Sequence, residues 1–322
     1  MAENLPVLSP APHIHSGETT GKIMWSVVVA LLPACSGSIL FFGWYALKVI
    51  LTTVGSCVLS EVISQLLFRR VIRIKDGSAV VTGLLLAFVL PPRIPLWMAG
   101  LGGFLAISLV KELFGGLGYN IFNPALAARA ILLASFPVEM TRFFQPFQYG
   151  VDAISCATPL GMMKENLSGA LPSLKAMFVG VRPGCLGETS PFLLLLGAWF
   201  LFARGIITWH IPLAYLGTVG FLSLIFHQNV LFQLMGGGLI LGAFFMATDY
   251  VTSPLTNRGK LIFGLGCGLI TVLIRMKGGY PEGVCYAILF MNMLVPMIDR
   301  ISLPTRYGAL KQGLRKAEEK SG

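Results

Sequence analysis

The chain has 322 residues, of which 55% are hydrophobic and only 12% are charged, and its mean hydropathy is +0.77. Because soluble domains carry about 25% charged residues, this composition excludes a water-soluble fold and predicts a polytopic membrane protein. The formal net charge of +10 does not indicate a nucleic-acid partner, since most basic residues lie next to apolar segments, where they act as a topology signal.

The first 22 residues are polar and lack the short apolar stretch and small-residue cleavage site of a signal peptide. We therefore expect residues 1–23 to form a cytoplasmic N-terminal segment. The first apolar segment then serves as an uncleaved insertion signal.

About ten apolar segments follow, and several are shorter than the roughly 20 residues that a membrane helix needs. Pro91-Pro92 and Asn123-Pro124 flank two of the short ones, which indicates half-helices buried inside the bundle. The expected segments are residues 24–42, 45–68, 78–91, 95–113, 122–137, 191–203, 209–226, 231–248, 260–276 and 283–299.

An internal repeat relates the two halves of the chain. Gly100–Gly102 aligns with Gly264–Gly266, and Lys111 aligns with Arg275. Five segments per half is an odd number, so the halves are expected to be inverted in the membrane. The predicted fold is an all-α polytopic membrane protein with about ten transmembrane segments in two inverted repeats of five, similar to urea channels. Its expected parts are a first repeat at 24–137, an extracytoplasmic loop at 138–190, a second repeat at 191–299 and a basic cytoplasmic tail at 300–322.

Basic residues set the expected orientation. They are dense in the Arg69–Lys75 loop and in the tail that follows Arg300, and sparse on the opposite side. The positive-inside rule therefore places both termini in the cytoplasm and the 138–190 loop outside. The expected location is the cytoplasmic (inner) membrane of a bacterium or archaeon.

Charged and polar residues inside apolar segments mark candidate sites. Arg129 costs about 2.5–3.5 kcal/mol at membrane depth, so it needs a partner such as a flavin phosphate, a carboxylate or helix C-terminal carbonyls. Asn120 and Asn123 precede a helix start, where we expect them to hydrogen-bond a flavin or loop carbonyls, or to cap the helix. Asp249 closes an apolar segment as a functional acid or a helix cap. Lys111 is expected to pair with the adjacent Glu112 or to extend to the interface.

A short motif in the 138–190 loop carries the most specific signal. It begins at Asp152 and continues through Ser155, Cys156, Ala157 and Thr158. It resembles the D-x-x-S-G-A-T pattern whose threonine carries covalent FMN in membrane subunits of Rnf and Na⁺-translocating NADH:quinone reductase complexes. Cys156 replaces the usual glycine, which puts the backbone freedom of the loop in question. An ordinary Ser/Thr-rich turn is the alternative.

Three further stretches, residues 76–83, 115–125 and 247–254, are similar to the same family. The chain is therefore identified as a member of the family that contains the D subunit of Rnf complexes, with the B subunit of the quinone reductase as the sister possibility. The short N-terminus favours the Rnf type.

The resemblance implies a flavoprotein subunit of an ion-translocating ferredoxin:NAD oxidoreductase. FMN esterified to Thr158 is expected to relay electrons and to couple them to Na⁺ or H⁺ transport, and a non-covalent riboflavin near Asn120–Arg129 is a further possibility. The expected partners are a flavin-bearing G subunit, the A and E membrane subunits, and an NAD-binding C subunit. This chain has no nucleotide-binding loop, so NADH is expected to meet another subunit.

Two other functional classes remain open. A urea- or ammonium-channel-like facilitator would share the architecture but would need neither the Thr158 motif nor Arg129. A scaffold subunit would show no visible absorbance. The six cysteines have no C-x-x-C spacing, so no metal centre is expected, although Cys156 and Cys185 share a loop and could pair.

Overall fold

The computed structural model describes residues 18–148, 155–165, 171–188 and 190–304 of the chain. Helices dominate it, and one short antiparallel pair of strands accompanies them. The elements are α1 (Thr20–Phe42), α2 (Trp44–Leu67), η1 (Ile74–Asp76), α3 (Ser78–Phe88), α4 (Leu96–Phe104), η2 (Leu105–Glu112), α5 (Pro124–Ser135), α6 (Pro137–Met140), β1 (Phe143–Phe144), β2 (Ser155–Cys156), α7 (Pro159–Lys164), α8 (Leu174–Val179), α9 (Pro191–Ala203), α10 (His210–Ile225), α11 (Val230–Met235), α12 (Leu239–Leu241), η3 (Gly242–Met246), α13 (Asn257–Lys277) and α14 (Val284–Ser302).

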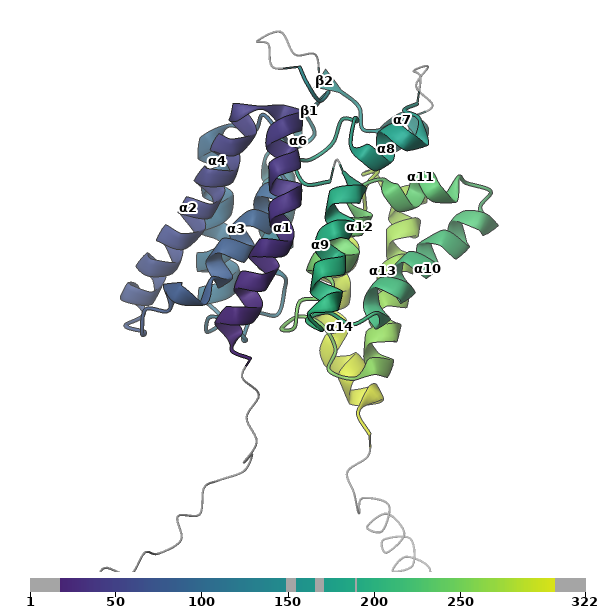
Figure 1. The fold of residues 1–322 in the computed structure, drawn as a ribbon. Coiled ribbons are helices and arrows are strands. Elements are labelled where there is room, and N and C mark those ends of the chain that lie inside the picture. The colour runs from purple at the N-terminus through teal and green to yellow at the C-terminus, as the bar shows by residue number, and fades with distance from the viewer. Residues whose placement is uncertain (1–17, 149–154, 166–170, 189, 305–322) are drawn as a thin grey trace, which may run out of the picture.

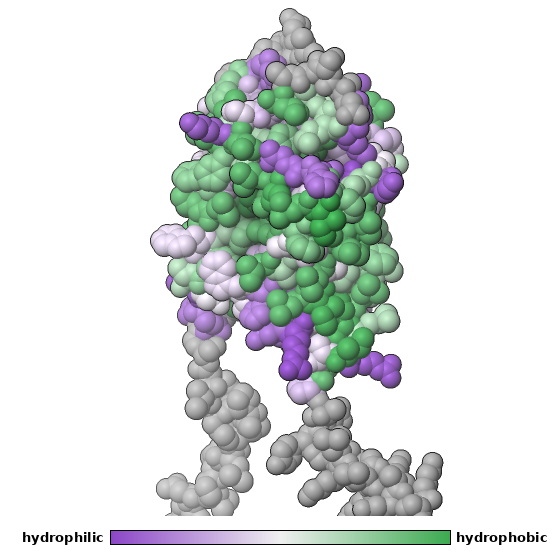
Figure 2. Space-filling view, turned by 90° about the vertical axis from the view of Figure 1, so that its right-hand side faces the viewer, coloured by the Kyte–Doolittle hydropathy of each residue, from purple (hydrophilic) through white to green (hydrophobic). Residues whose placement is uncertain are grey.

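The helices form a bundle with two distinct ends (Figure 1). Helix α1 begins and helix α14 ends at one of them, here called the terminal side, and the segment from α6 to α8 lies at the opposite end, here called the loop side. Helices α1, α2, α13 and α14 are long and apolar enough to cross a membrane. Figure 2 shows a broad hydrophobic band with hydrophilic residues gathered above and below it. The chain is therefore a multi-pass membrane protein.

Most of the expected segments coincide with helices, but the one expected at 231–248 does not form a single helix. Helix α11 ends at Met235, and Gly237 and Gly238 adopt left-handed φ angles of 60° and 67° before α12 begins. Only glycine takes these angles without strain, so the helix is broken there and restarts as α12 and the π-helix η3. The break produces a short half-helix that enters the bundle from the loop side (Figure 1).

Glycines also bring the helices together closely. A Cβ added at Gly197 on α9 would lie 2.0 Å from the carbonyl oxygen of Ala30 on α1, and one added at Gly264 on α13 would lie 2.8 Å from Ala214 on α10. Membrane helices associate through such small residues because lipid provides no hydrophobic force between them. Substitution at these glycines would push the helices apart.

Candidate functional site

The Thr158 motif is held between a strand and a helix. Phe143 and Phe144 of β1 pair antiparallel with Cys156 and Ser155 of β2, and helix α7 begins shortly after. Thr158 is the N-cap of α7, and its Oγ1 accepts a hydrogen bond from the Gly161 amide at 3.2 Å. The motif is thus an ordered turn whose threonine has a structural role as a cap.

The structure describes Cys156 of this motif but not Asp152. Cys156 has no positive φ, so this position does not need glycine and the substitution leaves the backbone unstrained. Asp152 lies outside the described residues. No disulfide joins Cys156 to Cys185, so the pairing that the shared loop allowed is not formed.

Thr158 is 8% exposed and lies on the wall of a cavity of about 320 Å³ on the loop side. Ala157 and Arg129 line the same cavity. So do Tyr280 and Tyr286, whose rings stack with centroids 6.0 Å apart and planes inclined by 24°. The cavity therefore combines a hydroxyl, a guanidinium, the carboxylates of Glu165 and Glu282, and flat aromatic surfaces, which is a suitable lining for a conjugated polar ligand.

Arg129 lies on α5 with two carboxylates around it. Its Nη1 donates to Glu188 Oε1 at 3.2 Å, and its Nη2 forms an ion pair with Glu282 and lies 3.6 Å from the Cys185 sulfur. The sequence left open a flavin phosphate, a carboxylate or helix C-terminal carbonyls as the partner of Arg129, and in the structure its partners are carboxylates. The Nε of Arg129 is buried and has no hydrogen-bond partner among the described residues, so one donor of the guanidinium is left without an acceptor.

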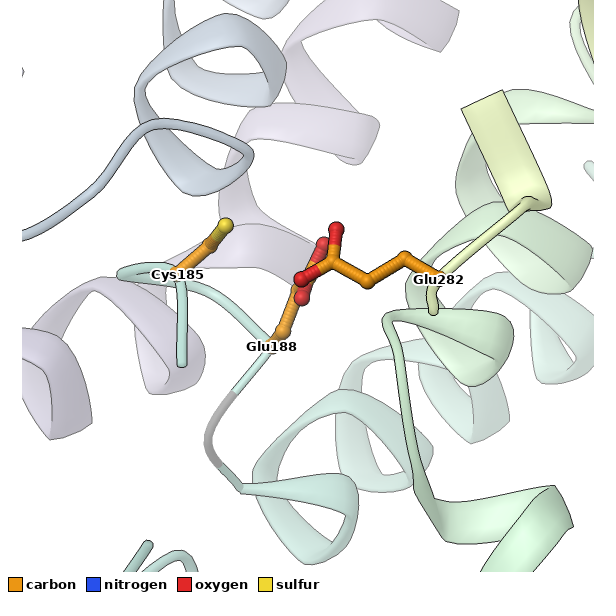
Figure 3. Close-up of side chains that lie close together, drawn as sticks. All are labelled: Cys185, Glu188 and Glu282. Carbon is orange, nitrogen blue, oxygen red and sulfur yellow. The ribbon is translucent and has the colours of Figure 1, made fainter. Parts of the chain in front are cut away.

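The side chains of Cys185, Glu188 and Glu282 point toward one another (Figure 3). Their ligand atoms lie within 4.8 Å of one another, a spacing that also suits a metal ion. The Arg129 guanidinium contacts both carboxylates, however, and a second cation there would meet its charge. The cluster is therefore a buried ion-pair network in this structure.

Burial dominates the electrostatics of this network. Burial and the nearby Glu282 carboxylate together raise the pKa of Glu188 to about 7, although Arg129 and Arg182 oppose the shift. Arg182 donates to the Glu188 carbonyl oxygen at 2.5 Å, and burial lowers the pKa of its guanidinium to about 10. Glu188 thus titrates near neutral pH.

The side chains of Asn120 and Asn123 hydrogen-bond mainly to backbone groups. Asn123 caps α5, since its Oδ1 accepts from the amides of Ala125 and Leu126 at 3.1 and 3.3 Å. Asn120 donates to the Phe122 carbonyl at 3.1 Å. Both line an inner cavity of about 90 Å³ that shares no lining residue with the Thr158 cavity. The structure therefore does not bring them to the same cavity as Thr158.

Asp249 follows η3 instead of beginning a helix. Its carboxylate accepts from the Val251 amide at 3.4 Å and from the Thr252 hydroxyl at 3.2 Å, so it stabilises a turn, and its side chain lines the same inner cavity as the asparagines.

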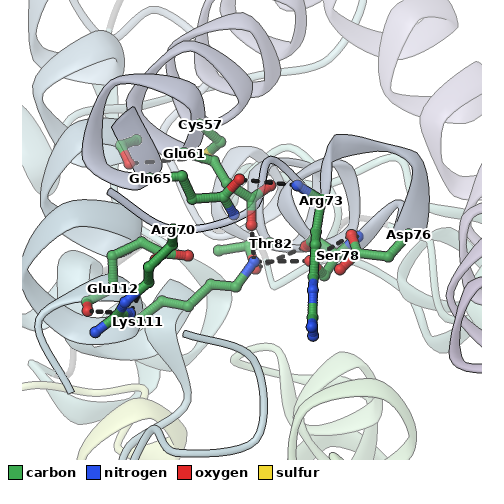
Figure 4. Close-up of polar contacts among 11 residues, drawn as sticks. Cys57, Glu61, Gln65, Arg70, Arg73, Asp76, Ser78, Thr82, Lys111 and Glu112 are labelled. Atoms are coloured by element: carbon green, nitrogen blue, oxygen red, sulfur yellow. Dashed lines mark hydrogen bonds and ion pairs between the residues drawn. The ribbon is translucent and has the colours of Figure 1, made fainter. Parts of the chain in front are cut away.

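The expected pairing of Lys111 with Glu112 is wrong. Lys111 is 2% exposed, and its ammonium pairs with Glu61 on α2 and bonds the Ser78 hydroxyl at 2.7 Å (Figure 4). Glu112 instead lies 3.4 Å from Arg70. Adjacent helical residues point about 100° apart, so neighbours in sequence do not face each other.

Sequence analysis missed Glu61, Glu188 and Glu282. Glu61 had a usable signal, because an acid inside the apolar 45–68 segment is as anomalous as Arg129. Glu188 and Glu282 lie in loops, where an acid carries no such signal. They could not be linked to Arg129, which is 59 and 153 residues away in the chain.

The sequence pattern of the NQR2, RnfD, RnfE family matches residues 7–308. The chain belongs to this family. The match spans both the Thr158 motif and the Arg129 cluster.

Curated relatives extend the assignment. The D subunit of the proton-translocating ferredoxin:NAD(+) oxidoreductase complex of Clostridium ljungdahlii is 46% identical over 321 residues, covering 95% of this chain and 97% of the relative. The D subunit of the Na(+)-translocating complex of Acetobacterium woodii is also 46% identical, covering 96% of each chain. The D subunit of an ion-translocating oxidoreductase complex of Stutzerimonas stutzeri is 42% identical, covering 91% and 93%.

Proposed function

We propose that this chain is the D-type membrane subunit of an ion-translocating ferredoxin:NAD oxidoreductase complex and that it relays electrons through FMN esterified to Thr158. Relatives that match along nearly their full length are named as such subunits. The observation that carries the flavin part is the cavity shared by Thr158 and Arg129.

The residues of this cavity fit a covalent flavin. Its volume of about 320 Å³ falls within the roughly 300–1,000 Å³ of ligand sites. Arg129 lines the cavity, and its guanidinium, which pairs with Glu188 and Glu282, would place positive charge beside an electron-rich ring or a phosphate oxygen. When bound, FMN would supply the one-electron redox chemistry that no side chain here can perform.

The chain's own groups would then have distinct tasks. Thr158 would tether the cofactor through Oγ1. Arg129 would stabilise negative charge in the cavity, and Tyr280 and Tyr286 would offer flat surfaces and exclude water. Glu188, whose pKa burial raises to about 7, would hold or release a proton beside Arg129 near neutral pH.

A second, non-covalent flavin is less well supported. The inner cavity at Asn120 and Asn123 has a volume of about 90 Å³, below the roughly 300 Å³ at which ligand sites begin. The residues present do not fit a riboflavin in this conformation, and no step is routed through one.

In the membrane, we propose ten segments in two inverted repeats of five, with both termini cytoplasmic and the loop side outside. The start of α1, the end of α14 and the basic Arg69–Lys75 loop all lie on the terminal side, which supports this orientation. Electrons would reach Thr158 from a flavin-bearing G subunit outside, with the A, E and C subunits completing the complex. A cytoplasm-dependent reporter should be active after Gly322 and silent near Ser168, and activity at both positions would contradict the orientation.

The transported ion is either H⁺ or Na⁺. Two relatives with equal identity are named for different ions, so overall similarity does not distinguish between them.

Flavin attachment can be tested on the denatured chain. A phosphoester survives denaturation, so the purified chain should fluoresce in a denaturing gel and gain the mass of one FMN. Thr158→Ala should abolish both signals. Thr141→Ala is the matched control, because Thr141 lines the same cavity outside the motif. A flavin-bearing peptide that maps to another residue would overturn the assignment.

A further inference from the structure

A large cleft opens on the terminal side, between the loop that follows α2 and the loop that follows η2. Its volume is about 920 Å³, the largest among the cavities described above. We call it the basic cleft, and the residues that define it are Arg69, Arg70, Arg73, Lys75, Gly115, Gly116, Gly118 and Tyr119.

Two of the three acids of the basic cleft form ion pairs within the protein. Glu61 pairs with Lys111, and Glu112 lies 3.4 Å from Arg70. Asp76 accepts hydrogen bonds from the amide and hydroxyl of the residue that begins α3, at 2.9 and 2.8 Å (Figure 4). Glu61 and Glu112 are therefore neutralised by their own partners, whereas Asp76, which has no ion pair among the described residues, keeps one negative charge in the cleft.

Three basic side chains remain. Arg69, Arg73 and Lys75 are exposed, and none forms an ion pair with any other described residue. These three cations outnumber Asp76, the carboxylate of the cleft that has no ion pair in the described part of the chain, so the open cleft presents an excess of positive charge. Such an arrangement attracts a multivalent anion.

The basic cleft lies at the level of a membrane interface. The indole of Trp25, which is 48% exposed, donates to the Lys75 carbonyl at 3.3 Å, and tryptophan is typical of the headgroup region. Val71 is 75% exposed and Ile72 is 48% exposed between the basic residues. Apolar side chains at these positions gain from contact with acyl chains and gain nothing from water.

The opposite wall of the cleft is a glycine loop. Gly115, Gly116 and Gly118 have φ angles of 131°, 94° and 97°, and a Cβ added at Gly118 would meet nothing within 4 Å. The backbone of this loop is therefore uncovered on the cleft side of Gly118, and a bulky headgroup can approach it closely.

We propose that the basic cleft binds the phosphate group of an anionic phospholipid from the leaflet on the terminal side. The guanidiniums of Arg69 and Arg73 donate to the phosphate oxygens in a fork geometry, Lys75 adds a point charge, and Val71 and Ile72 contact the acyl chains. The positive-inside rule explains why basic residues lie on this side. It does not explain why three of them face one cleft, since Arg258 and Lys260 follow the same rule without lining it.

The test uses the purified full complex and native mass spectrometry with added phosphatidylglycerol or phosphatidylcholine. The wild type should retain phosphatidylglycerol in preference to phosphatidylcholine by about tenfold, and Arg69→Gln/Arg73→Gln should lose this preference. The control Arg258→Gln/Lys260→Gln removes the same charge on the same side and should keep it. Lys75→Gln, a single exposed change, should lower the preference partially.

Three outcomes would overturn the proposal. One is an unchanged preference in the Arg69/Arg73 variant when the complex stays monodisperse, and another is an equal loss in the control. The third is displacement of the lipid by millimolar inorganic phosphate, which would assign the cleft to a soluble phosphate compound. None of these results depends on flavin attachment at Thr158.

Discussion

Two buried cations, Lys111 in the last turn of η2 and Arg275 in the last turn of α13, are stabilised in different ways. Lys111 ends η2 on the terminal side and pairs with the carboxylate of Glu61. Arg275, near the end of α13 on the loop side, has no carboxylate within ion-pair distance among the described residues. Its guanidinium donates instead to Gln233 O and Oε1 at 2.7 and 2.9 Å, to Gly236 O at 2.9 Å and to Glu282 O at 3.2 Å.

The difference shows two physical solutions to one problem. A buried ammonium has three donors and little reach, so a full opposite charge provides most of its stabilisation. A guanidinium has five donors in a plane, and several carbonyl dipoles can replace the water that it loses. The first site depends on one charged partner, assisted by the Ser78 hydroxyl, whereas the second spreads the same task over four acceptors.

The largest expected effect comes from removing that single partner. Glu61→Leu leaves the Lys111 charge buried and unpaired and should destabilise the protein by about 3–5 kcal/mol. Thermal denaturation in detergent, followed by size-exclusion chromatography, measures the loss. Glu61→Leu/Lys111→Met removes both charges and should recover most of the stability. If the double variant is no better than the single one, the ion pair is not what the first site depends on.

A smaller loss of stability is expected at Arg275, whose hydrogen bonds go to four acceptors. Arg275→Lys keeps the charge but cannot reach all four oxygens, so two of its charged hydrogen bonds are lost and stability should fall by about 2–3 kcal/mol. The same heating assay measures it. Lys277→Arg, in the same last turn of α13, is the matched control. If Arg275→Lys is as stable as the wild type, the positive charge alone, and not the guanidinium fork, stabilises this site.

A third cation, Arg129, is stabilised by two carboxylates, and its partner Glu188 adds a dependence on pH. The pKa of Glu188 is raised from 4.5 to about 7, so the folded state binds this proton more readily than the unfolded state. Its contribution to stability is therefore present at low pH and is lost as pH rises through about 7. We expect the protein to be about 1 kcal/mol less stable at pH 8 than at pH 6 on this account.

Glu188→Gln imitates the protonated form and should flatten that pH dependence. Thermal midpoints of the wild type and the variant between pH 6 and pH 8 measure the difference. Glu165→Gln, an exposed change on the rim of the same cavity, should leave the dependence intact. Parallel curves for the wild type and Glu188→Gln would contradict the assignment of this titration to Glu188.

The smallest change in stability should come from giving Arg275 a carboxylate partner, as Lys111 has. Gln233→Glu gives Arg275 a carboxylate at the position of an oxygen that it already contacts at 2.9 Å. The added attraction and the added desolvation cost nearly cancel, so stability should change by less than about 1 kcal/mol. The heating assay with the Gln233→Ala variant as reference measures it. A change of several kcal/mol in either direction would show that the two sites are not alternative solutions to the same problem.

Individual elements show how much of the fold the sequence predicted. The apolar run at 191–203 coincides with α9, because hydropathy is a local property of the chain. The single helix expected at 231–248 is wrong, because three consecutive glycines break it. Hydropathy alone does not detect such a break. Thr158 was found because its neighbours in the chain form the motif, and its position in an ordered turn at a cavity adds what the motif did not contain.

The sequence by itself determined the membrane class, the approximate helix boundaries, the Thr158 motif and membership of the family, because each depends on residues that are adjacent or regularly spaced. Only the tertiary structure decided that Arg129 meets Glu188 and Glu282, that Lys111 meets Glu61, and that Thr158 and Arg129 share a cavity. A buried charge requires a partner, and burial makes that requirement strong, but which partner meets it depends on how helices far apart in the chain pack together.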